Sequence, residues 1–286
     1  MKPMKVVFIL GSGHCGATLL DLILDSHSEM CGIGEFHSGR STSICSCGKP
    51  AGECAIWQDA LGPLPWKEQG IFKSKADLLF DRGQYRMTRG EHVPVDPKTF
   101  IASNLEVFRK VLAGRGKSIV VDSSKEVERT EVLSMSPEIE PIVIHIVRDG
   151  HGSTWTYVNK YKEVFPYFYM WAFSNLKVEV LRRRFKRLAG GRGKFIYVRL
   201  PDLVRDPAGV IGRLCEEVGV TFEPSMLSFD EHPHHQIEGN RTRFVKGHTI
   251  YPDSWRKEMP TGLRMCWTVC FGWLNVYYMR LRRSFS

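Results

Sequence analysis

The sequence predicts an α/β protein built on a parallel β-sheet that is flanked by helices. Short apolar runs rich in β-branched residues occupy 5–10, 118–121, 142–147 and 195–199. Each run ends in a turn, and the turn is followed by a segment with helical periodicity. This alternation favours a parallel sheet whose ligands bind beyond the carboxyl ends of the strands.

The first unit is the clearest. The run 5–10 is continuously apolar and ends at glycines, which is typical of a buried parallel strand. The segment 17–26 then places leucine and isoleucine on one helical face, with Asp21 and Asp25 on the other. The sequence therefore predicts a strand, a glycine turn and a helix in direct succession.

The later units repeat this order. The second strand runs into DSSK and a helix that starts at Glu126, and the third runs into RDG and another helix. The fourth strand precedes an amphipathic stretch over 203–218. The segment 265–283 is aromatic and then basic, and we expect it to form a helix docked on the core.

Length and composition narrow the class of protein. The chain has 286 residues, 43% of them hydrophobic, a length that suits one large α/β domain or two small ones, and we expect a single domain over 1–286. The net charge of +9 suits an anionic ligand, nucleic acid or an acidic membrane and does not by itself choose among them. Its eight cysteines without a cationic, apolar leader predict reduced thiols and a cytoplasmic location. No apolar run predicts a transmembrane segment, and no motif predicts nucleic-acid binding. The weakly periodic stretch 40–115 predicts an inserted cap, whose aromatic residues and arginines are candidates for the acceptor wall: Trp57, Trp66, Phe72, Phe80 and Tyr85.

The turn after the first strand reads GSGHCGATLL and resembles a phosphate-binding loop of the P-loop type, G-x-x-x-x-G-K-[ST]. Ala17 stands where that pattern has lysine. The backbone amides and the helix dipole still favour a 5′-phosphate, so the loop suits a nucleotide whose transferable group needs little help from a metal ion. An adenylyl phosphosulfate is such a donor. The predicted nucleotide contacts are Gly11, Ser12, Gly13, His14, Cys15, Gly16, Ala17 and Thr18.

Several stretches together identify a family resemblance. They are GSGHCGATLLDLILDSHSEM with GIGE, CSCGKPAGECAIW, VVDSSK, HIVRDGHGSTWT, DLVRDP and GNRTRF. In order and spacing they resemble the sulfotransferases that use 3′-phosphoadenosine 5′-phosphosulfate (PAPS), in particular the bacterial, tyrosylprotein and carbohydrate branches. The resemblance implies PAPS as donor and its desulfated product, 3′-phosphoadenosine 5′-phosphate (PAP). It further implies a hydroxyl- or amine-bearing small molecule or glycan as acceptor, and no required metal.

The resemblance also implies roles for residues on the donor side. Arg148 and Thr156 match the 3′-phosphate site, and Ser153 is a further hydroxyl at the same helix start. His14 stands where the family usually has arginine or lysine, which makes it a further catalytic candidate at the sulfuryl group, either protonated or donating a hydrogen bond. Late in the chain, GNRTRF resembles a loop that folds over the nucleotide, which makes further candidates of Asn240, Arg241 and Arg243. The family's tyrosine–glutamate pair is replaced by Leu200 and Pro201, and Trp255 is a candidate for ring stacking or for the core.

On the acceptor side, Glu35 matches the family's general base, and His37 is a rival base or a second acceptor contact. Lys125 matches a lysine that contacts the sulfuryl oxygens and the leaving phosphate. We expect Asp122 to cap its turn instead of taking part in the reaction.

Two clusters of potential metal ligands remain open. Cys45, Cys47 and Cys54 form a C-x-C-x6-C group that is compatible with free thiols, a disulfide or a zinc site with Cys31 or His37. For His232, His234 and His235 we expect a loop of solvated side chains. Two other functions also fit the sequence: a nucleotide kinase with a degenerate loop, and a binding protein for PAP or another nucleotide that lacks catalysis.

Overall fold

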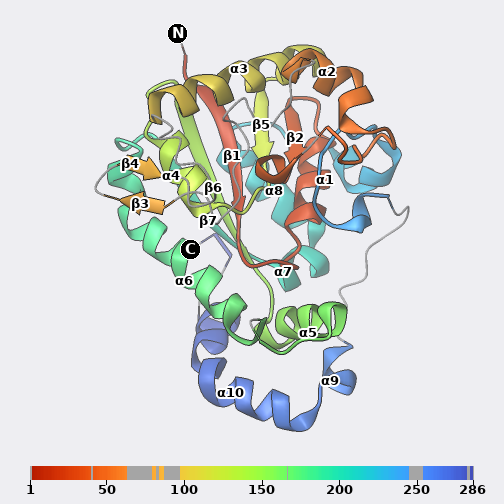
Figure 1. Cartoon of the computed structure of the whole chain (residues 1–286), viewed down its shortest axis with the longest axis vertical. Coiled ribbons are helices and arrows are strands. Elements are labelled where there is room, and N and C mark those ends of the chain that lie inside the picture. Colours follow the sequence, from red (N-terminus) through yellow and green to blue (C-terminus); the bar gives the residue numbers. More distant parts are fainter. Residues whose placement is uncertain are drawn as a thin grey trace.

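A five-stranded parallel sheet forms the centre of the computed structural model, in the order β2-β5-β1-β6-β7 (Figure 1). Its strands are β1 (Met4–Leu10), β2 (Met30–Gly34), β5 (Ile119–Asp122), β6 (Ile139–Val147) and β7 (Lys194–Arg199). The structure describes residues 2–39, 41–62, 79–81, 84–86, 97–165, 167–244, 254–281 and 284–285. The predicted α/β class and parallel sheet are therefore confirmed.

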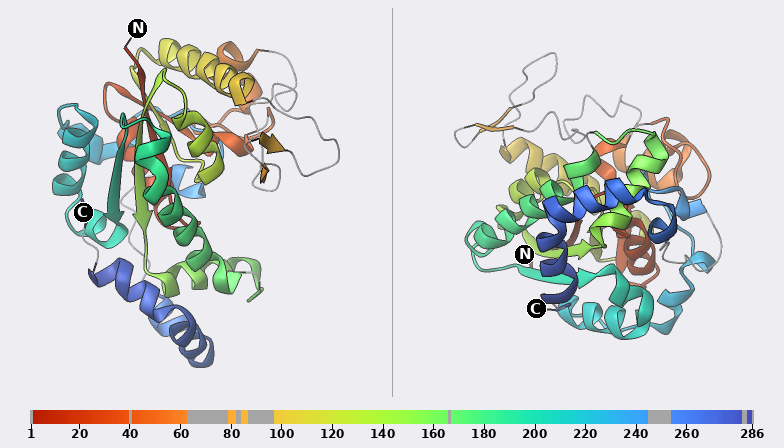
Figure 2. Two further views of the ribbon diagram at one scale, coloured as in Figure 1. Left: turned by 90° about the vertical axis from the view of Figure 1, so that its left-hand side faces the viewer. Right: turned by 90° about the horizontal axis from the view of Figure 1, so that it is seen from below.

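Helices cover both faces of this sheet (Figures 1 and 2). One face carries α2 (Ala55–Leu61), α3 (Pro97–Arg115), α4 (Val127–Ser134) and α6 (Tyr167–Leu188). The other carries α1 (Ala17–Asp25), α7 (Leu200–Arg205), α8 (Pro207–Val218) and the 3-10 segment η4 (Pro224–Glu231). Within β1, Val6 and Phe8 point to the first layer, whereas Val7 and Ile9 point to the second, as the twofold alternation of a strand requires.

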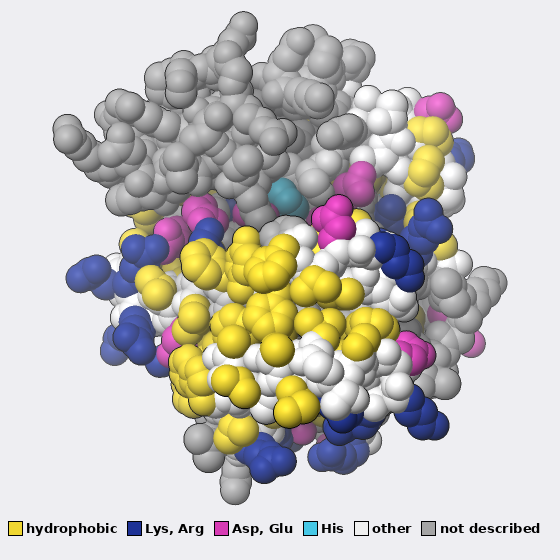
Figure 3. All heavy atoms as spheres, turned by 60° about the horizontal axis from the view of Figure 1, so that its bottom comes forward, with side chains coloured by type: hydrophobic (Ala, Val, Ile, Leu, Met, Phe, Trp, Pro, Cys, Tyr) yellow, Lys and Arg dark blue, Asp and Glu magenta, His cyan; other side chains and the backbone are white. Residues whose placement is uncertain are grey.

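Beyond the sheet, an aromatic cluster joins α5 (Gly150–Tyr161) and α6 to α9 (Trp255–Glu258) and α10 (Thr261–Val276). Trp267 and Leu274 dock α10 on this cluster, which the π-helical turn η6 (Tyr277–Leu281) extends. The opposite side of α10 is exposed. Figure 3, which brings the bottom of the view in Figure 1 forward, shows hydrophobic side chains gathered on this end of the molecule. The exposed large hydrophobic residues of α6 and α10 are Tyr169, Phe173, Leu176, Val180, Met265, Val269, Trp273 and Val276.

Short elements complete the described chain. The 3-10 turns η1 (Phe36–Ser38) and η2 (Ala51–Glu53) follow β2, and η5 (Arg241–Phe244) follows η4. The strands β3 (Leu79–Asp81) and β4 (Gln84–Arg86) form a small antiparallel pair. Among the described residues, no helix is long and apolar enough to cross a membrane.

The predicted insertion at 40–115 is too long, because its last part, 97–115, belongs to the core of the domain. Helix α3 belongs to the core layer, because its apolar side chains pack on β2 and β5. Trp57 of the expected acceptor wall is also a core residue, only 1% exposed and stacked on Phe36. Trp66 and Phe72 lie outside the described residues, and so does most of 63–96.

The predicted stretch 203–218 is two helices. Asp206 ends α7 and caps α8 by accepting a hydrogen bond from Gly209 N (2.9 Å). Pro207 has no N–H to continue the preceding helix, but its fixed φ suits the first position of the next one.

Candidate active site

The loop after β1 lies at the carboxyl edge of the sheet and leads directly into α1. Gly16 occupies the N-cap of α1 with φ +96°, a left-handed conformation that favours glycine. Gly13, His14, Gly16, Ala17 and Thr18 line a cavity of about 600 Å³. The helix N-terminus therefore presents its amides to this cavity.

The remaining loop residues lie behind this lining. Ser12 is 1% exposed, and its hydroxyl lies 3.3 Å from that of Ser153. Ser153 donates a hydrogen bond to Gly13 O at 2.9 Å. Gly11 and Cys15 are buried as well. Ser153, predicted as a nucleotide contact, thus holds the loop in place instead of lining the cavity.

Arg148 and Thr156 meet in the cavity from the end of β6 and from α5. The Arg148 guanidinium is 4% exposed and donates to His14 O (3.2 Å) and to Thr156 Oγ1 (3.3 Å). Asp149 caps α5 by accepting from Gly152 N, and Trp171 Nε1 donates to Arg148 O at 2.9 Å. A fixed guanidinium beside a hydroxyl is a suitable binding group for phosphate.

Glu35 and Lys125 form an ion pair on the opposite side of the cavity, at the ends of β2 and β5. Lys125 has a left-handed φ of +60°, a conformation that is uncommon for a residue other than glycine. Burial opposes the charged form of Lys125, but its acidic neighbours, Glu35 foremost among them, together outweigh the burial and raise the pKa of the ammonium group. The cavity thus holds a cation and a carboxylate side by side.

Two histidines line the same cavity. His14 packs edge-on against Tyr157, with ring centroids 4.6 Å apart. Burial, assisted by the positive charges of Lys160 and Arg148, lowers the pKa of His14 to about 4. Burial likewise lowers the pKa of His37 to about 4, and its Nε2 lies 3.4 Å from Glu126 Oε1. Both imidazoles are therefore neutral at pH 7, so the His14 side chain brings no positive charge to the cavity.

These pKa values predict a pH-dependent stability. Unfolding restores each histidine to its ordinary value of 6.5, so the unfolded chain binds protons that the folded chain excludes. The contribution of these two histidines to the free energy of unfolding is thus fully present above pH 6.5 and is lost as the pH falls toward 4, by up to about 1.4 kcal/mol per pH unit for each histidine. Urea unfolding of wild type and of a His14→Asn/His37→Gln variant checks this: the variant should have the shallower acid slope, and equal slopes would contradict the expectation.

Helix α5 supplies lining residues that the sequence reasoning did not identify, namely Tyr157, Lys160 and Tyr161. Tyr157 stacks on Tyr167, and Tyr161 stacks on Tyr167 as well. Lys160 lies one helical turn beyond Thr156, and this i, i+4 spacing is the signal that could have found it. Leu200 also lines the cavity, where the family resemblance would place a tyrosine–glutamate pair.

The segment after η4 contributes part of the rim. Asn240 lines the cavity, and its backbone N–H donates to Thr18 Oγ1 at 3.2 Å. Arg243 points away from the cavity, since it donates to Glu238 O and, at 2.8 Å, to Ile44 O. Arg241 is exposed and lies outside the cavity lining. The structure therefore brings Asn240 to the site and leaves both arginines beside it.

Other predicted residues have structural partners. Asp122 accepts from Ser124 N and from Arg129 Nε, both at 2.9 Å, which agrees with a turn cap. Trp255 stacks on His151 with centroids 4.8 Å apart. The expectation of three solvated histidines is wrong for His234, which is buried with Nδ1 2.6 Å from Asp25 Oδ2.

Comparison with known proteins identifies the fold. The glycine-containing loop after β1 and the buried arginine after β6 both lie at the carboxyl edge of a parallel α/β sheet, where such folds bind their ligands. No protein-family model matches the sequence, and no curated protein matches it in a sequence comparison.

Among the solved structures that resemble the chain, two are similar over nearly its whole length and are both sulfotransferase domains. The sulfotransferase domain of the Synechococcus PCC 7002 olefin synthase has 18% identity and a TM-score of 0.52, covering 95% of this chain and 96% of that one. The sulfotransferase domain from the curacin biosynthetic pathway has 15% identity and a TM-score of 0.54, covering 95% and 99%. The protein therefore has the sulfotransferase fold, as its motifs predicted.

Proposed function

We propose that the protein is a PAPS-dependent sulfotransferase and that residues 1–286 form one catalytic domain. The observation that carries this proposal is the convergence of four features on one cavity: the amides at the start of α1, the Arg148–Thr156 pair, Lys125 and Glu35. The sulfotransferase fold supports the same assignment. The cytoplasmic location stays a prediction.

The donor would bind along the loop and β6. The amides of 13–18 suit its 5′-phosphosulfate, and Arg148 with Thr156 suits its 3′-phosphate. Ala17 removes the usual loop lysine, and Lys125 supplies a positive charge from across the cavity. PAPS brings to this site a sulfuryl group that can be transferred without a metal ion.

Glu35 would act as general base on the acceptor. Its carboxylate takes the proton of the acceptor hydroxyl while the acceptor oxygen forms a bond to sulfur and the bond from sulfur to the phosphate oxygen breaks. The electron pair of that bond leaves with PAP. Lys125, the ion-pair partner of Glu35, would stabilise the negative charge that develops on the leaving oxygen.

The acceptor would enter beside Glu35 and the segment 239–242, where Gly239 lies close to the Glu35 side chain. Tyr157, Tyr161 and Leu200 give the cavity as a whole an aromatic and apolar wall. Burial raises the pKa of Tyr157, so its hydroxyl remains a hydrogen-bond donor at neutral pH. This lining suits a hydroxyl- or amine-bearing small molecule or the terminal sugar of a glycan.

A thermal-shift comparison tests the nucleotide assignment. A ligand that binds only the folded chain raises its melting temperature, so we expect a large rise with PAP in EDTA and little change with AMP or with ATP and Mg²⁺. A larger rise with ATP and Mg²⁺ would instead assign the cavity to phosphoryl transfer. A rise with PAP but no transfer of labelled sulfate from PAPS to any acceptor would indicate a binding protein without catalysis.

A further inference from the structure

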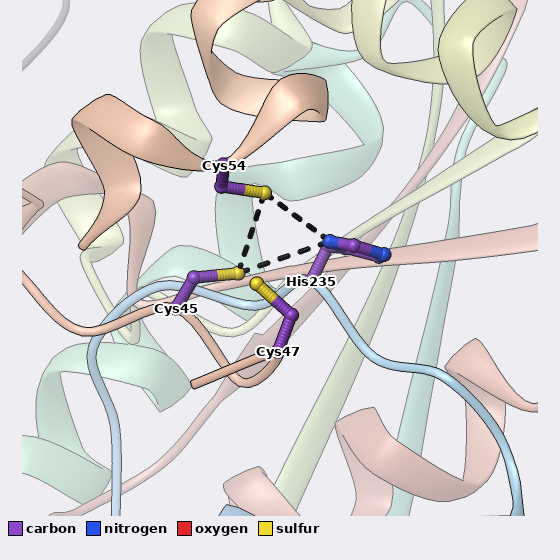
Figure 4. A group of neighbouring side chains, drawn as sticks. All are labelled: Cys45, Cys47, Cys54 and His235. Carbon is purple, nitrogen blue, oxygen red and sulfur yellow. Dashed lines mark hydrogen bonds between the residues drawn. The ribbon is translucent and has the colours of Figure 1, made fainter. Parts of the chain in front are cut away.

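Three cysteines and one histidine from distant parts of the chain point toward one another (Figure 4). They are Cys45, Cys47, Cys54 and His235. Their sulfur and nitrogen ligand atoms all lie within 4.8 Å of one another. Cys54 Sγ lies 3.2 Å from His235 Nδ1 and 3.7 Å from Cys45 Sγ.

These separations fit a tetrahedral zinc ion. Zinc lies about 2.3 Å from thiolate sulfur and about 2.0–2.1 Å from imidazole nitrogen, so two ligand atoms of one site lie roughly 3.5–3.8 Å apart. Cys45 Sγ lies 3.9 Å from His235 Nδ1 and 3.7 Å from Cys54 Sγ. The ligand atoms of Cys45, Cys54 and His235 therefore already have separations close to those of a tetrahedral site, and Cys47 Sγ lies within 4.8 Å of each of them.

The backbone around the four side chains is fixed independently of any metal. Cys45 N donates to Lys49 O, and Gly48 N donates to Cys45 O, both at 2.8 Å, which closes a tight turn around Cys47. Cys54 caps α2 and accepts from Trp57 N at 2.9 Å. The indole of Trp57 donates to His235 O at 2.6 Å, which holds the histidine against the core.

We propose that Cys45, Cys47, Cys54 and His235 bind one zinc ion in a closed structural site. A disulfide between Cys45 and Cys54 would use two of the sulfurs and leave unexplained why a third thiol and an imidazole nitrogen face the same point. All four zinc positions are filled by side chains, so no position is open for water or substrate. None of the four residues lines the candidate active site, and the ion is structural whatever reaction that site performs.

The zinc site connects the segment after β2 to the segment after η4. Cys45 pairs with Ile237, two residues after His235, and Ile237 in turn pairs with Gly34. Gly34 has φ +76°, and a Cβ there would lie 2.2 Å from Ile237 O, so the two backbones can approach only at glycine. Ile237 O accepts from Glu35 N at 2.9 Å. The ion therefore fastens the backbone that carries Glu35.

Metal analysis of the intact protein tests this inference without any activity assay. We expect the wild type, purified in reducing buffer without chelator, to contain about one zinc per chain. Metal-free protein that is then loaded with Co²⁺ should develop the visible absorption of a tetrahedral thiolate complex. In a separate experiment, removal of zinc from the wild type should lower its melting temperature by several degrees.

The variants identify the ligands. Because Cys47 is exposed, we expect Cys47→Ser to fold. It should bind zinc more than about 100-fold more weakly than the wild type, since one of the four ligands is lost. We expect the same loss of zinc affinity in His235→Gln. Cys266→Ser and Cys270→Ser change exposed cysteines of α10 and should retain the full zinc content. The inference would be overturned if the folded wild type contained no zinc and its thiols reacted freely. It would also be overturned if the mass of the wild-type chain were two hydrogen atoms lighter than calculated, because this difference marks a disulfide. Unchanged zinc in Cys47→Ser and His235→Gln would overturn this ligand set.

Discussion

Glu35→Gln is expected to lower turnover by about 10²- to 10⁴-fold while leaving the affinity for PAP nearly unchanged. Proton transfer by a positioned carboxylate contributes a factor of this size, and glutamine cannot accept the proton. The amide keeps the size of the side chain and can still accept a hydrogen bond from Lys125, its partner in the wild type. Labelled sulfate transfer and a PAP titration measure the two quantities on the same preparation.

The control for Glu35 is His37→Gln, which removes the rival base from the same cavity. We expect a much smaller loss of turnover, since Glu126 and Ser124 already contact His37. If His37→Gln loses as much turnover as Glu35→Gln, or if Glu35→Gln retains turnover, the general base is assigned to the wrong residue. A loss in Glu35→Gln that shrinks with more acidic phenol acceptors would further distinguish a base from a residue that only positions Lys125.

Arg148→Ala is expected to weaken PAP binding by about 1.5–3 kcal/mol, which is roughly 10- to 150-fold in Kd. The guanidinium is buried, and its hydrogen bonds to His14 O and Thr156 Oγ1 hold it in position before a ligand binds. Its removal therefore takes a pre-positioned cation away from the proposed 3′-phosphate site. Calorimetric titration with PAP and with adenosine 5′-phosphosulfate, which lacks the 3′-phosphate, measures the effect.

Only the ligand with the 3′-phosphate should lose most of its affinity in Arg148→Ala. Equal losses for both ligands would mean that Arg148 acts through the loop, whose His14 carbonyl it holds. Arg205→Ala, a change at an exposed arginine of α7, is the matched control and should bind both ligands as the wild type does. Similar losses of PAP affinity in Glu35→Gln and Arg148→Ala would contradict the proposed division between acceptor and donor sides.

Local patterns predicted the parts of the fold that depend on neighbouring residues. The apolar run before Gly11 and the helical face after Gly16 define β1 and α1 within a few positions of the observed bounds. The motif HIVRDGHGSTWT likewise predicted that Arg148 follows a buried strand and that Thr156 lies on the next helix. Both residues line the cavity, because strand and helix periodicity fix where such side chains point.

Elements with weaker local signals were missed. The strand β2 has the sequence MCGIG, in which two glycines hide the strand pattern. Helix α3 was placed within the insertion, although its buried face, which includes Phe100, Phe108 and Val111, packs on the sheet. In both cases burial against other elements outweighs the weak propensity of the segment itself.

The sequence by itself determined the α/β class, the loop after the first strand and the residues that follow each strand, because these depend on side-chain periodicity and on turns within a few positions. Only the tertiary structure decided which distant residues meet. Glu35 and Lys125 are 90 positions apart, and Cys45 and His235 are 190 apart. Their pairing follows from strand order and from the course of 235–240 beside β2, which are set by burial of the whole core and not by any local pattern.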